Sequence, residues 1–276
     1  MSTTCSFRRW WAHLAPLIGC LTLIVVIAFA HAAGEEKEKA PTGRKEVKVD
    51  SKEASKLVDA IVNRNKPPQI VRCRGYLPSK VPLFPKDYDW KEEDRVRKAL
   101  SKLNEDTSVA LWDALVQKVD DPHYCVATYS GNTSDVEMRS VGQVCHRLAY
   151  GRLCDVFEQH LPSFPPHGCP IYLQEVGRDL PGWRKDRKDK ALYQLQIEVC
   201  EITLRKLVEL DAKEVSDKEK AEARKKIEAE IKELRRTKTP KEGGGTPRPY
   251  PRDEAERVRE SYEKGTLEKF ESGLNK

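Results

Sequence analysis

The segment Ala191–Leu210 constrains the fold more than any other part of the chain. Leucine and valine recur at helical spacing along one of its faces, and a second set of apolar residues lines another face. More than half of the circumference of such a helix is apolar. A helix of this kind must be covered on several sides, so we expect it to lie at the centre of a packed helical domain.

Other segments have the one-sided apolar periodicity of amphipathic helices, and several begin with an acidic or hydroxyl residue that can cap a helix. Two proline-rich stretches, Gln69–Tyr88 and Leu161–Gly182, separate them and are expected to form extended arms or loops. The pattern predicts an all-α core, either a compact helical bundle or HEAT-like helical hairpins with proline-rich connecting loops. The expected helices begin at Asp50, Asp89 and Asp106–Ser108 and include Val141–Leu161.

One run in this core has the composition of a strand. His123–Ser130 is rich in β-branched and aromatic residues. A lone strand has no hydrogen-bonding partner, so we interpret this run as an extended connector. The following segment, Ser134–Glu137, is expected to cap the helix that contains Val141–Leu161.

The N-terminus has the parts of an export leader in their usual order. Arg8 and Arg9 are followed by the apolar run Leu14–Ala30 and by the small-x-small signal Ala30-His31-Ala32. The sequence therefore predicts that residues 1–32 are a cleaved signal peptide or an uncleaved signal anchor that tethers the chain to the inner membrane through residues 14–30. Lipid attachment at Cys20 is a third alternative, although most of the apolar run follows that cysteine. Each of these alternatives predicts an extracytoplasmic location, periplasmic or secreted.

The remaining segments differ in composition from the core. Residues 33–49 are charged and lack periodicity, which indicates a linker, and residues 50–210 form the predicted core domain. Residues 211–239 have a narrow apolar stripe among alternating charges and predict a charged, coiled-coil-like amphipathic helix. Residues 240–276 are expected to be a Gly/Pro hinge followed, from Arg252, by either a marginal helix or a disordered tail.

The charge balance argues against a nucleic-acid-binding protein. The formal net charge of +6 falls to +4 once Arg8 and Arg9 are removed with the leader. Nucleic-acid binding needs basic residues gathered on one face. The basic segment Arg184–Lys190 contains interleaved aspartates, which favours a solvated helix start over a site for anionic lipid.

The expected mature part contains an even number of cysteines in a compartment that can oxidise them. Cys145 and Cys154 are nine residues apart, which on a continuous helix separates them by about 13.5 Å along the axis and places them on opposite faces. They cannot pair with each other. We predict disulfides that hold the proline-rich loops on the helices, or else small buried apolar side chains. The six cysteines are Cys73, Cys125, Cys145, Cys154, Cys169 and Cys200.

The sequence lacks the motifs of common metal and cofactor sites, including Cys-x-x-Cys and His-Glu-x-x-His. We therefore predict no metal and no cofactor. A Cys–His nucleophile pair would combine Cys145 or Cys169 with His160 or His167, and a pocket for it could also collect His146. Such a site would make the chain an extracytoplasmic hydrolase.

Several core segments resemble those of uncharacterised exported helical proteins from planctomycete-type bacteria. They are FPKDYDWKEEDRVRKAL, LWDALVQKVDDPHYC, SVGQVCHRLAYGRL and ALYQLQIEVCEITLRKL, within Phe84–Leu207. The resemblance implies an exported helical fold and no known activity.

The sequence favours a non-enzymatic, exported helical domain that binds protein partners in the cell envelope. The alternative is the hydrolase, with its Cys/His or carboxylate site between the 141–161 helix and the 161–182 loop. A pocket that holds the histidines together with cysteines or carboxylates would favour the enzyme.

Overall fold

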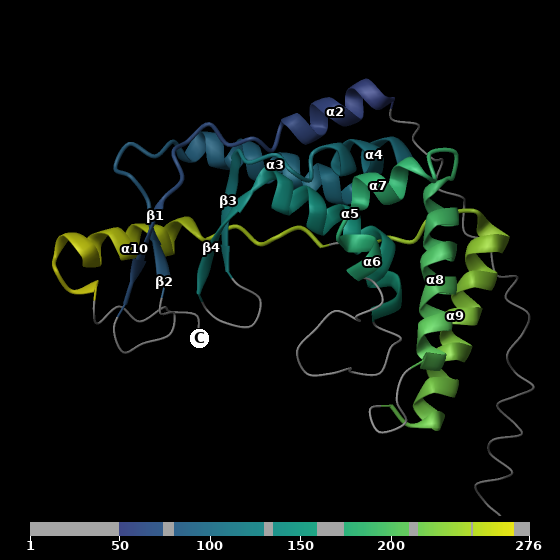
Figure 1. Ribbon diagram of the computed structural model, residues 1–276. Coiled ribbons are helices and arrows are strands. Elements are labelled where there is room, and N and C mark those ends of the chain that lie inside the picture. The colour runs from purple at the N-terminus through teal and green to yellow at the C-terminus, as the bar shows by residue number, and fades with distance from the viewer. Residues whose placement is uncertain are drawn as a thin grey trace, which may run out of the picture. The chain divides into compact units, whose positions relative to one another are not determined.

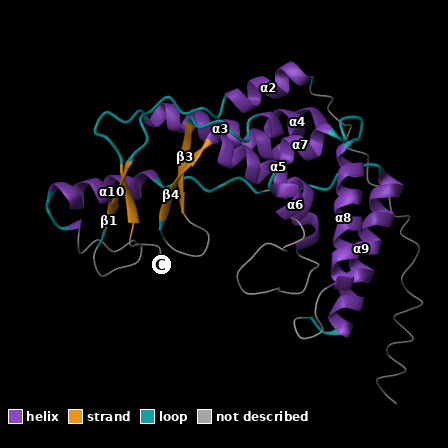
Figure 2. Ribbon diagram, in the orientation of Figure 1, coloured by secondary structure: helices purple, strands orange, loops and turns teal. Residues whose placement is uncertain are grey.

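The computed structural model describes residues 50–73, 80–129, 135–158, 174–209, 215–243 and 245–267. All of them lie within one compact unit, Val47–Lys276. In these ranges the chain is mostly helical, with two small antiparallel sheets of two strands each (Figures 1 and 2). The helices are α2 (Ser51–Asp59), α3 (Trp90–Glu105), α4 (Val109–Gln117), α5 (Val141–Glu158), α6 (Gln174–Gly177), α7 (Leu180–Lys185), α8 (Leu192–Glu209), α9 (Asp217–Thr237) and α10 (Arg252–Glu263). The strands are β1 (Gln69–Arg72), β2 (Lys80–Leu83), β3 (Tyr124–Tyr129) and β4 (Val136–Ser140).

Three helices begin where the sequence predicts. The Asp50 side chain accepts hydrogen bonds from the backbone amides of Lys52 and Glu53, at 2.7 and 2.8 Å. Asp89 caps α3 and Ser108 caps α4 in the same way. Each cap satisfies backbone amides that have no partner in the first turn of a helix.

The main hydrophobic core lies around α5 and α8, as the sequence predicts. α5 packs against α4 and α8, and the indole nitrogen of the fully buried Trp112 in α4 donates a hydrogen bond to the Ala149 carbonyl of α5 at 2.9 Å. The face of α8 that contains Leu195, Val199 and Cys200 is buried in the same core. The polar tip of the tryptophan thus has a partner inside an otherwise apolar interior.

The prediction of an all-α core is wrong at β3 and β4. β3 pairs with β4 in an antiparallel sheet, so the run interpreted as a lone connector does have a partner. The same pairing shows that residues 136–140 are a strand rather than the cap of α5. Instead, Ser140 begins α5, with its hydroxyl accepting from the Gln143 amide at 3.1 Å.

The proline-rich arm also contains a sheet. β1 pairs with β2 in antiparallel register, with Ile70 opposite Pro82. Proline donates no backbone hydrogen bond, so it fits at the edge of a sheet. A sheet of two strands consists of edges only, and this explains how a proline-punctuated arm can still pair.

The C-terminal region is folded where the structure describes it, and α10 corresponds to the helix alternative for residues 252–276. We call residues 245–251 the C-terminal strap. The Tyr250 amide donates to the Ala127 carbonyl of β3 at 2.8 Å, and Nη2 of Arg97 donates to the Tyr250 carbonyl at 2.6 Å. The Tyr250 side chain is 1% exposed, and Val258 of α10 is fully buried. Two apolar side chains thus anchor a segment whose average composition is that of a solvated tail.

Helices α8 and α9 form an antiparallel hairpin and lie side by side (Figure 1). Nη2 of Arg235 lies 2.8 Å from Oε1 of Glu201, and the Gln196 side chain hydrogen-bonds to both the amide and the carbonyl of Lys241. These contacts fix the register of the hairpin. No helix in the described ranges is both long enough and apolar enough to span a bilayer.

Candidate functional site

Of the cysteines that the sequence predicts as disulfide or catalytic residues, those that the structure describes lie in the hydrophobic interior. The described cysteines form no disulfide with one another, and Cys73, Cys125, Cys145 and Cys200 carry free thiols. Burial raises the pKa of the Cys145 thiol to about 12. A thiol reacts as its thiolate, so Cys145 is a poor nucleophile in this setting. Cys169 lies outside the described residues, and disulfide pairing through it stays a prediction.

The geometric argument about Cys145 and Cys154 is confirmed. α5 runs without interruption from Val141 to Glu158, through Gly151. Both cysteine side chains are fully buried, each on its own face of a continuous helix. They are therefore packing residues of α5, the helix that contacts neighbours on both sides.

Among the residues that the structure describes, His146 meets no cysteine in a catalytic pair. Its Nε2 lies 2.7 Å from the Gly177 carbonyl, and its ring stacks on Tyr150 with centroids 6.0 Å apart. This contact joins α5 to α6. His160 and His167 lie outside the described residues, so the hydrolase stays a prediction that depends on them. No three His, Cys, Asp or Glu side chains gather into a metal site within the described ranges.

A buried polar cluster, which we call the Glu93 network, joins α3 to the segment that follows α2 and to β3, where the Asn63 side-chain amide donates to the Cys125 carbonyl at 3.1 Å. The Glu93 carboxylate accepts hydrogen bonds from the Tyr88 hydroxyl at 2.7 Å and from the Asn63 amide at 2.8 Å. Nε of Arg97 lies 3.6 Å from its other oxygen, and the Glu93 side chain is 2% exposed. Because its groups contact one another rather than solvent, this network is a structural element.

The basic segment 184–190 is also occupied by internal contacts. The Arg184 guanidinium donates to both oxygens of Asp113 at 2.6 and 3.0 Å, and Arg187 stacks over Trp183 and donates to Glu198. These arginines hold α7 against α4 and α8. The other five residues of the segment are exposed, so the segment is solvated, as the sequence favours, but it forms the end of α7 and a turn before α8 rather than the start of a helix.

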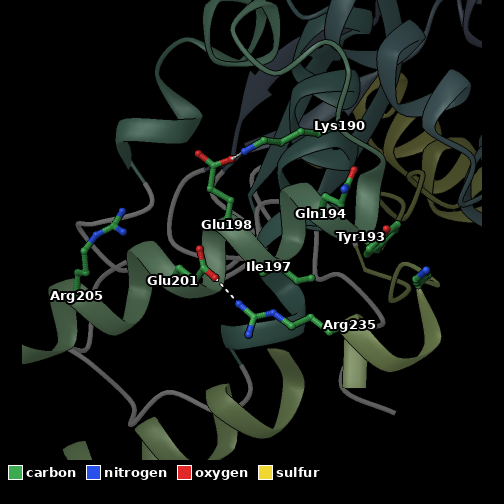
Figure 3. Close-up of a pocket in the computed structure, with 9 residues that line it drawn as sticks. Lys190, Tyr193, Gln194, Ile197, Glu198, Glu201, Arg205 and Arg235 are labelled. Atoms are coloured by element: carbon green, nitrogen blue, oxygen red, sulfur yellow. Dashed lines mark hydrogen bonds and ion pairs between the residues drawn. The ribbon is translucent and has the colours of Figure 1, made fainter. Parts of the chain in front are cut away.

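Charged side chains line a groove at the surface of the hairpin that α8 and α9 form (Figure 3). We call it the α8–α9 groove. Its volume is about 590 Å³. It presents four cationic side chains and two carboxylates, together with the rings and chains of less polar residues. Its lining residues are Lys190, Tyr193, Gln194, Ile197, Glu198, Glu201, Arg205, Arg235 and Lys238.

Two of the four cations in the groove are neutralised inside it. Nζ of Lys190 lies 2.6 Å from Oε2 of Glu198, and Arg235 pairs with Glu201 (Figure 3). Burial alone would raise the pKa of Glu198, but hydrogen bonds from Lys190 and Arg187 hold that pKa below its ordinary value. Both groove carboxylates are therefore already engaged.

The other two cations are available to a ligand. Among the residues that the structure describes, the side chains of Arg205 and Lys238 have neither a hydrogen bond nor an ion pair. Both residues are exposed. The half-buried side chains of Tyr193 and Ile197 line the groove with them. The arrangement can bind an anionic group and contact an apolar one. The described residues of its lining include no cysteine, serine or histidine that could act as a nucleophile or base.

The sequence does not reveal this groove, because helical spacing alone predicts an ion pair for Arg205. Glu201 precedes it by four residues and Glu209 follows it by four, and such pairs commonly interact on a helix. In the structure Glu201 binds Arg235, and Glu209 lies 3.2 Å from Lys206. Only the packing of α9 on α8 shows that Arg205 is left without a counter-charge in the described residues.

Comparison of the chain with protein-family models, with curated proteins and with solved structures finds no match. The resemblance to exported helical proteins of planctomycete-type bacteria therefore stays a prediction.

Proposed function

We propose that this chain is a non-enzymatic, exported helical domain that binds protein partners in the cell envelope through the α8–α9 groove. The observation that carries the proposal is the pair of exposed cations, Arg205 and Lys238, beside apolar lining residues. A surface of this composition is complementary to an acidic segment of a protein.

The apolar part of the groove favours a peptide over a small inorganic anion. Tyr193 and Ile197 are only half-buried, so a ligand that covers them gains from the removal of apolar surface from water. A free phosphate would use the two cations and leave these side chains exposed. An acidic segment with apolar residues of its own would use both.

The proposal includes the export leader and the architecture. The positive n-region, apolar run and small-x-small signal within residues 1–32 support an extracytoplasmic location, where the domain is released or stays tethered through residues 14–30. We propose that the α8–α9 hairpin corresponds to one unit of the predicted HEAT-like helical hairpins. Its exposed groove would then be the binding face, as concave faces are in stacked helical hairpins.

The test is the binding of a fluorescein-labelled peptide of mixed glutamate and leucine to the full chain, followed by fluorescence anisotropy. We expect saturable binding that weakens as salt is added, because exposed charges are screened. The double variant R205E/K238E should lower the affinity by roughly tenfold or more.

The matched control changes two exposed cations of α9 that do not line the groove, Lys225 and Lys232. The variant K225E/K232E changes the net charge by the same amount and should bind the peptide almost as tightly as the unmodified chain. Equal losses in the two double variants would refute the groove as the binding site. A peptide that does not bind the unmodified chain would refute the proposed function itself.

A further inference from the structure

A second cleft, which we call the strap cleft, lies between α3 and the C-terminal strap. Its volume is about 160 Å³, and it shares no described lining residue with the α8–α9 groove. A closed cavity of about 150 Å³ can hold one benzene ring, so the strap cleft has room for a ligand of that size. Its walls consist of Arg97, Leu100, Ser101 and Asn104 on α3 and of Thr246 with two prolines on the strap.

The strap wall of the cleft is fixed on β3. The Tyr250 amide donates to the Ala127 carbonyl, and Pro249 lies opposite Thr128 in an isolated antiparallel bridge. Because amides of an extended strand alternate in direction, the position of Pro249 faces away from β3 and loses no hydrogen bond to it. The prolines of the strap also restrict its backbone. A ligand would therefore meet a preformed wall.

Among the lining residues that the structure describes, Arg97 is the only charged one. Its guanidinium is held on two sides, since Nη2 donates to the Tyr250 carbonyl at 2.6 Å and Nε lies 3.6 Å from Oε1 of Glu93. Its Nη1 makes no hydrogen bond with any described residue. A guanidinium held in this way can donate to a ligand from its remaining nitrogen with little further loss of side-chain freedom.

Two further polar groups on the walls make no hydrogen bond with the described residues. They are the Asn104 amide on α3 and the Thr246 hydroxyl on the strap. Asn104 follows Arg97 by seven residues, so both lie on the same face of α3. The cleft also contains apolar surface from the buried residues Leu100 and Pro247. Its two walls thus combine hydrogen-bond donors with apolar contacts.

We propose that the strap cleft binds a small organic carboxylate whose apolar part is about the size of a benzene ring. The carboxylate accepts hydrogen bonds from Arg97 and Asn104, because a guanidinium binds a carboxylate more strongly than a neutral acceptor. Thr246 donates from the opposite wall, and the apolar part contacts Leu100 and Pro247. The site is independent of the function proposed for the α8–α9 groove.

The test is a titration of the ¹⁵N-labelled full chain with sodium benzoate, followed by NMR. We expect saturable shifts of the backbone amide signals of Ser101, Asn104 and Thr246, with a dissociation constant in the millimolar range that is usual for ligands of few atoms. Benzamide has nearly the same shape but no charge, and it should bind about tenfold more weakly. Equal affinity for the two compounds, or no saturable shift with benzoate, would overturn the proposal.

Two variants each remove one donor that has no other partner among the described residues, so the fold should stay intact. Asn104→Ala and Thr246→Val should each weaken benzoate binding by about three- to tenfold. Gln117→Ala is the matched control, because it removes an exposed amide of α4 outside the cleft. It should bind benzoate as tightly as the unmodified chain. Unchanged affinity in both cleft variants would contradict the assignment of these donors and overturn the site.

The double variant R205E/K238E separates the strap cleft from the α8–α9 groove. It should bind benzoate normally, since neither residue lines the strap cleft. Loss of benzoate binding in this variant, or shifts confined to α8 and α9, would place the ligand in the α8–α9 groove and overturn the strap cleft as its site. The acidic-peptide titration is read separately, so the two proposals can fail independently.

Discussion

The Glu93 network and the α8–α9 groove use similar chemical groups in opposite ways. Each contains a glutamate carboxylate that faces an arginine. In the network Glu93 faces Arg97, one turn further along α3, and in the groove Glu201 of α8 faces Arg235 of α9. The Glu93 side chain is 2% exposed, whereas that of Glu201 is 42% exposed. In the network the carboxylate contacts only other groups of the protein. In the groove, water or a ligand can replace the contact between Glu201 and Arg235.

The difference shows that burial decides what a charged residue does in this fold. A buried carboxylate that loses its partners keeps the full cost of desolvation. An exposed carboxylate regains water when its partner leaves, so its ion pair contributes little to stability. The Glu93 network can therefore fix the arrangement of α3, β3 and the segment that follows α2, while the groove is free to exchange internal contacts for those of a ligand.

The largest effect that tests this comparison is on folding stability. Glu93→Ala removes the acceptor for Tyr88 and Asn63 and leaves Arg97 without its counter-charge, so we expect the free energy of unfolding to fall by about 3–5 kcal/mol. Glu201→Ala, the matched change in the groove, should lower it by less than about 1 kcal/mol. Urea unfolding of the three proteins gives both values. Similar losses in the two variants would mean that burial does not separate the regions.

A smaller effect concerns Glu92, the neighbour of Glu93 in α3. It accepts two hydrogen bonds of 2.7 Å from the Arg95 guanidinium and one of 3.0 Å from the Arg64 amide. Chiefly because of Arg95, the pKa of Glu92 falls from 4.5 to about 2. A depressed folded-state pKa contributes stability that is present above the unfolded pKa and is lost as the pH falls towards the folded pKa.

We therefore expect Glu92→Gln to be less stable than the unmodified chain at neutral pH, with a difference that shrinks as the pH falls from about 4.5 to about 2. Urea midpoints measured across this pH range check the expectation. Glu233→Gln is the control, since Glu233 contacts an arginine in the same bidentate manner on α9 but has a side chain that is 41% exposed, against 13% for Glu92. A pH-independent difference for Glu92→Gln would show that its ionisation is not coupled to folding.

The sequence predicts the longer core helices well because each is coded locally, whereas α6 and the start of α7 lie in the stretch 161–182, whose prolines predict a loop. Caps such as Asp50 and Asp89 act within one turn, and the apolar faces of α5 and α8 are visible as periodicity. The β3–β4 pairing cannot be predicted from such local signals. β4 contains Glu137 and Arg139, so its strand character comes from a partner rather than from composition. A two-stranded sheet depends on contacts that no single segment reveals.

The candidate site and the burial of Tyr250 are not predicted by the sequence, for the same reason. Tyr250 lies among prolines and charged residues, and only the pocket formed by β3, α3 and Phe84 explains why it is buried. Arg205 has acidic neighbours at helical spacing and lacks a counter-charge only because α9 brings Arg235 to Glu201. The burial of Tyr250 and the lack of a counter-charge for Arg205 both depend on contacts between residues that are far apart in the sequence.

The smallest expected effect concerns Lys238, where the groove and the backbone make opposite demands. Lys238 ends α9 with φ 53° and ψ 23°, in the left-handed region that favours glycine. A side chain in that region costs about 1 kcal/mol relative to glycine. The chain thus keeps a cation in the groove at a position where glycine would be more stable.

Lys238→Gly should therefore raise the free energy of unfolding by up to about 1 kcal/mol and at the same time weaken binding of the acidic peptide. Lys238→Asn is the matched variant, because asparagine tolerates the left-handed conformation but lacks the charge. It should weaken binding to the same extent with a smaller gain in stability. Urea unfolding and anisotropy titration of the same preparations separate the two quantities. A lower stability of Lys238→Gly would contradict this expectation. It would mean that the charge of Lys238 stabilises the C-terminus of α9 by more than the left-handed backbone conformation costs. Lys238 would then be a structural charge, like those of the Glu93 network, rather than a ligand-binding charge of the groove.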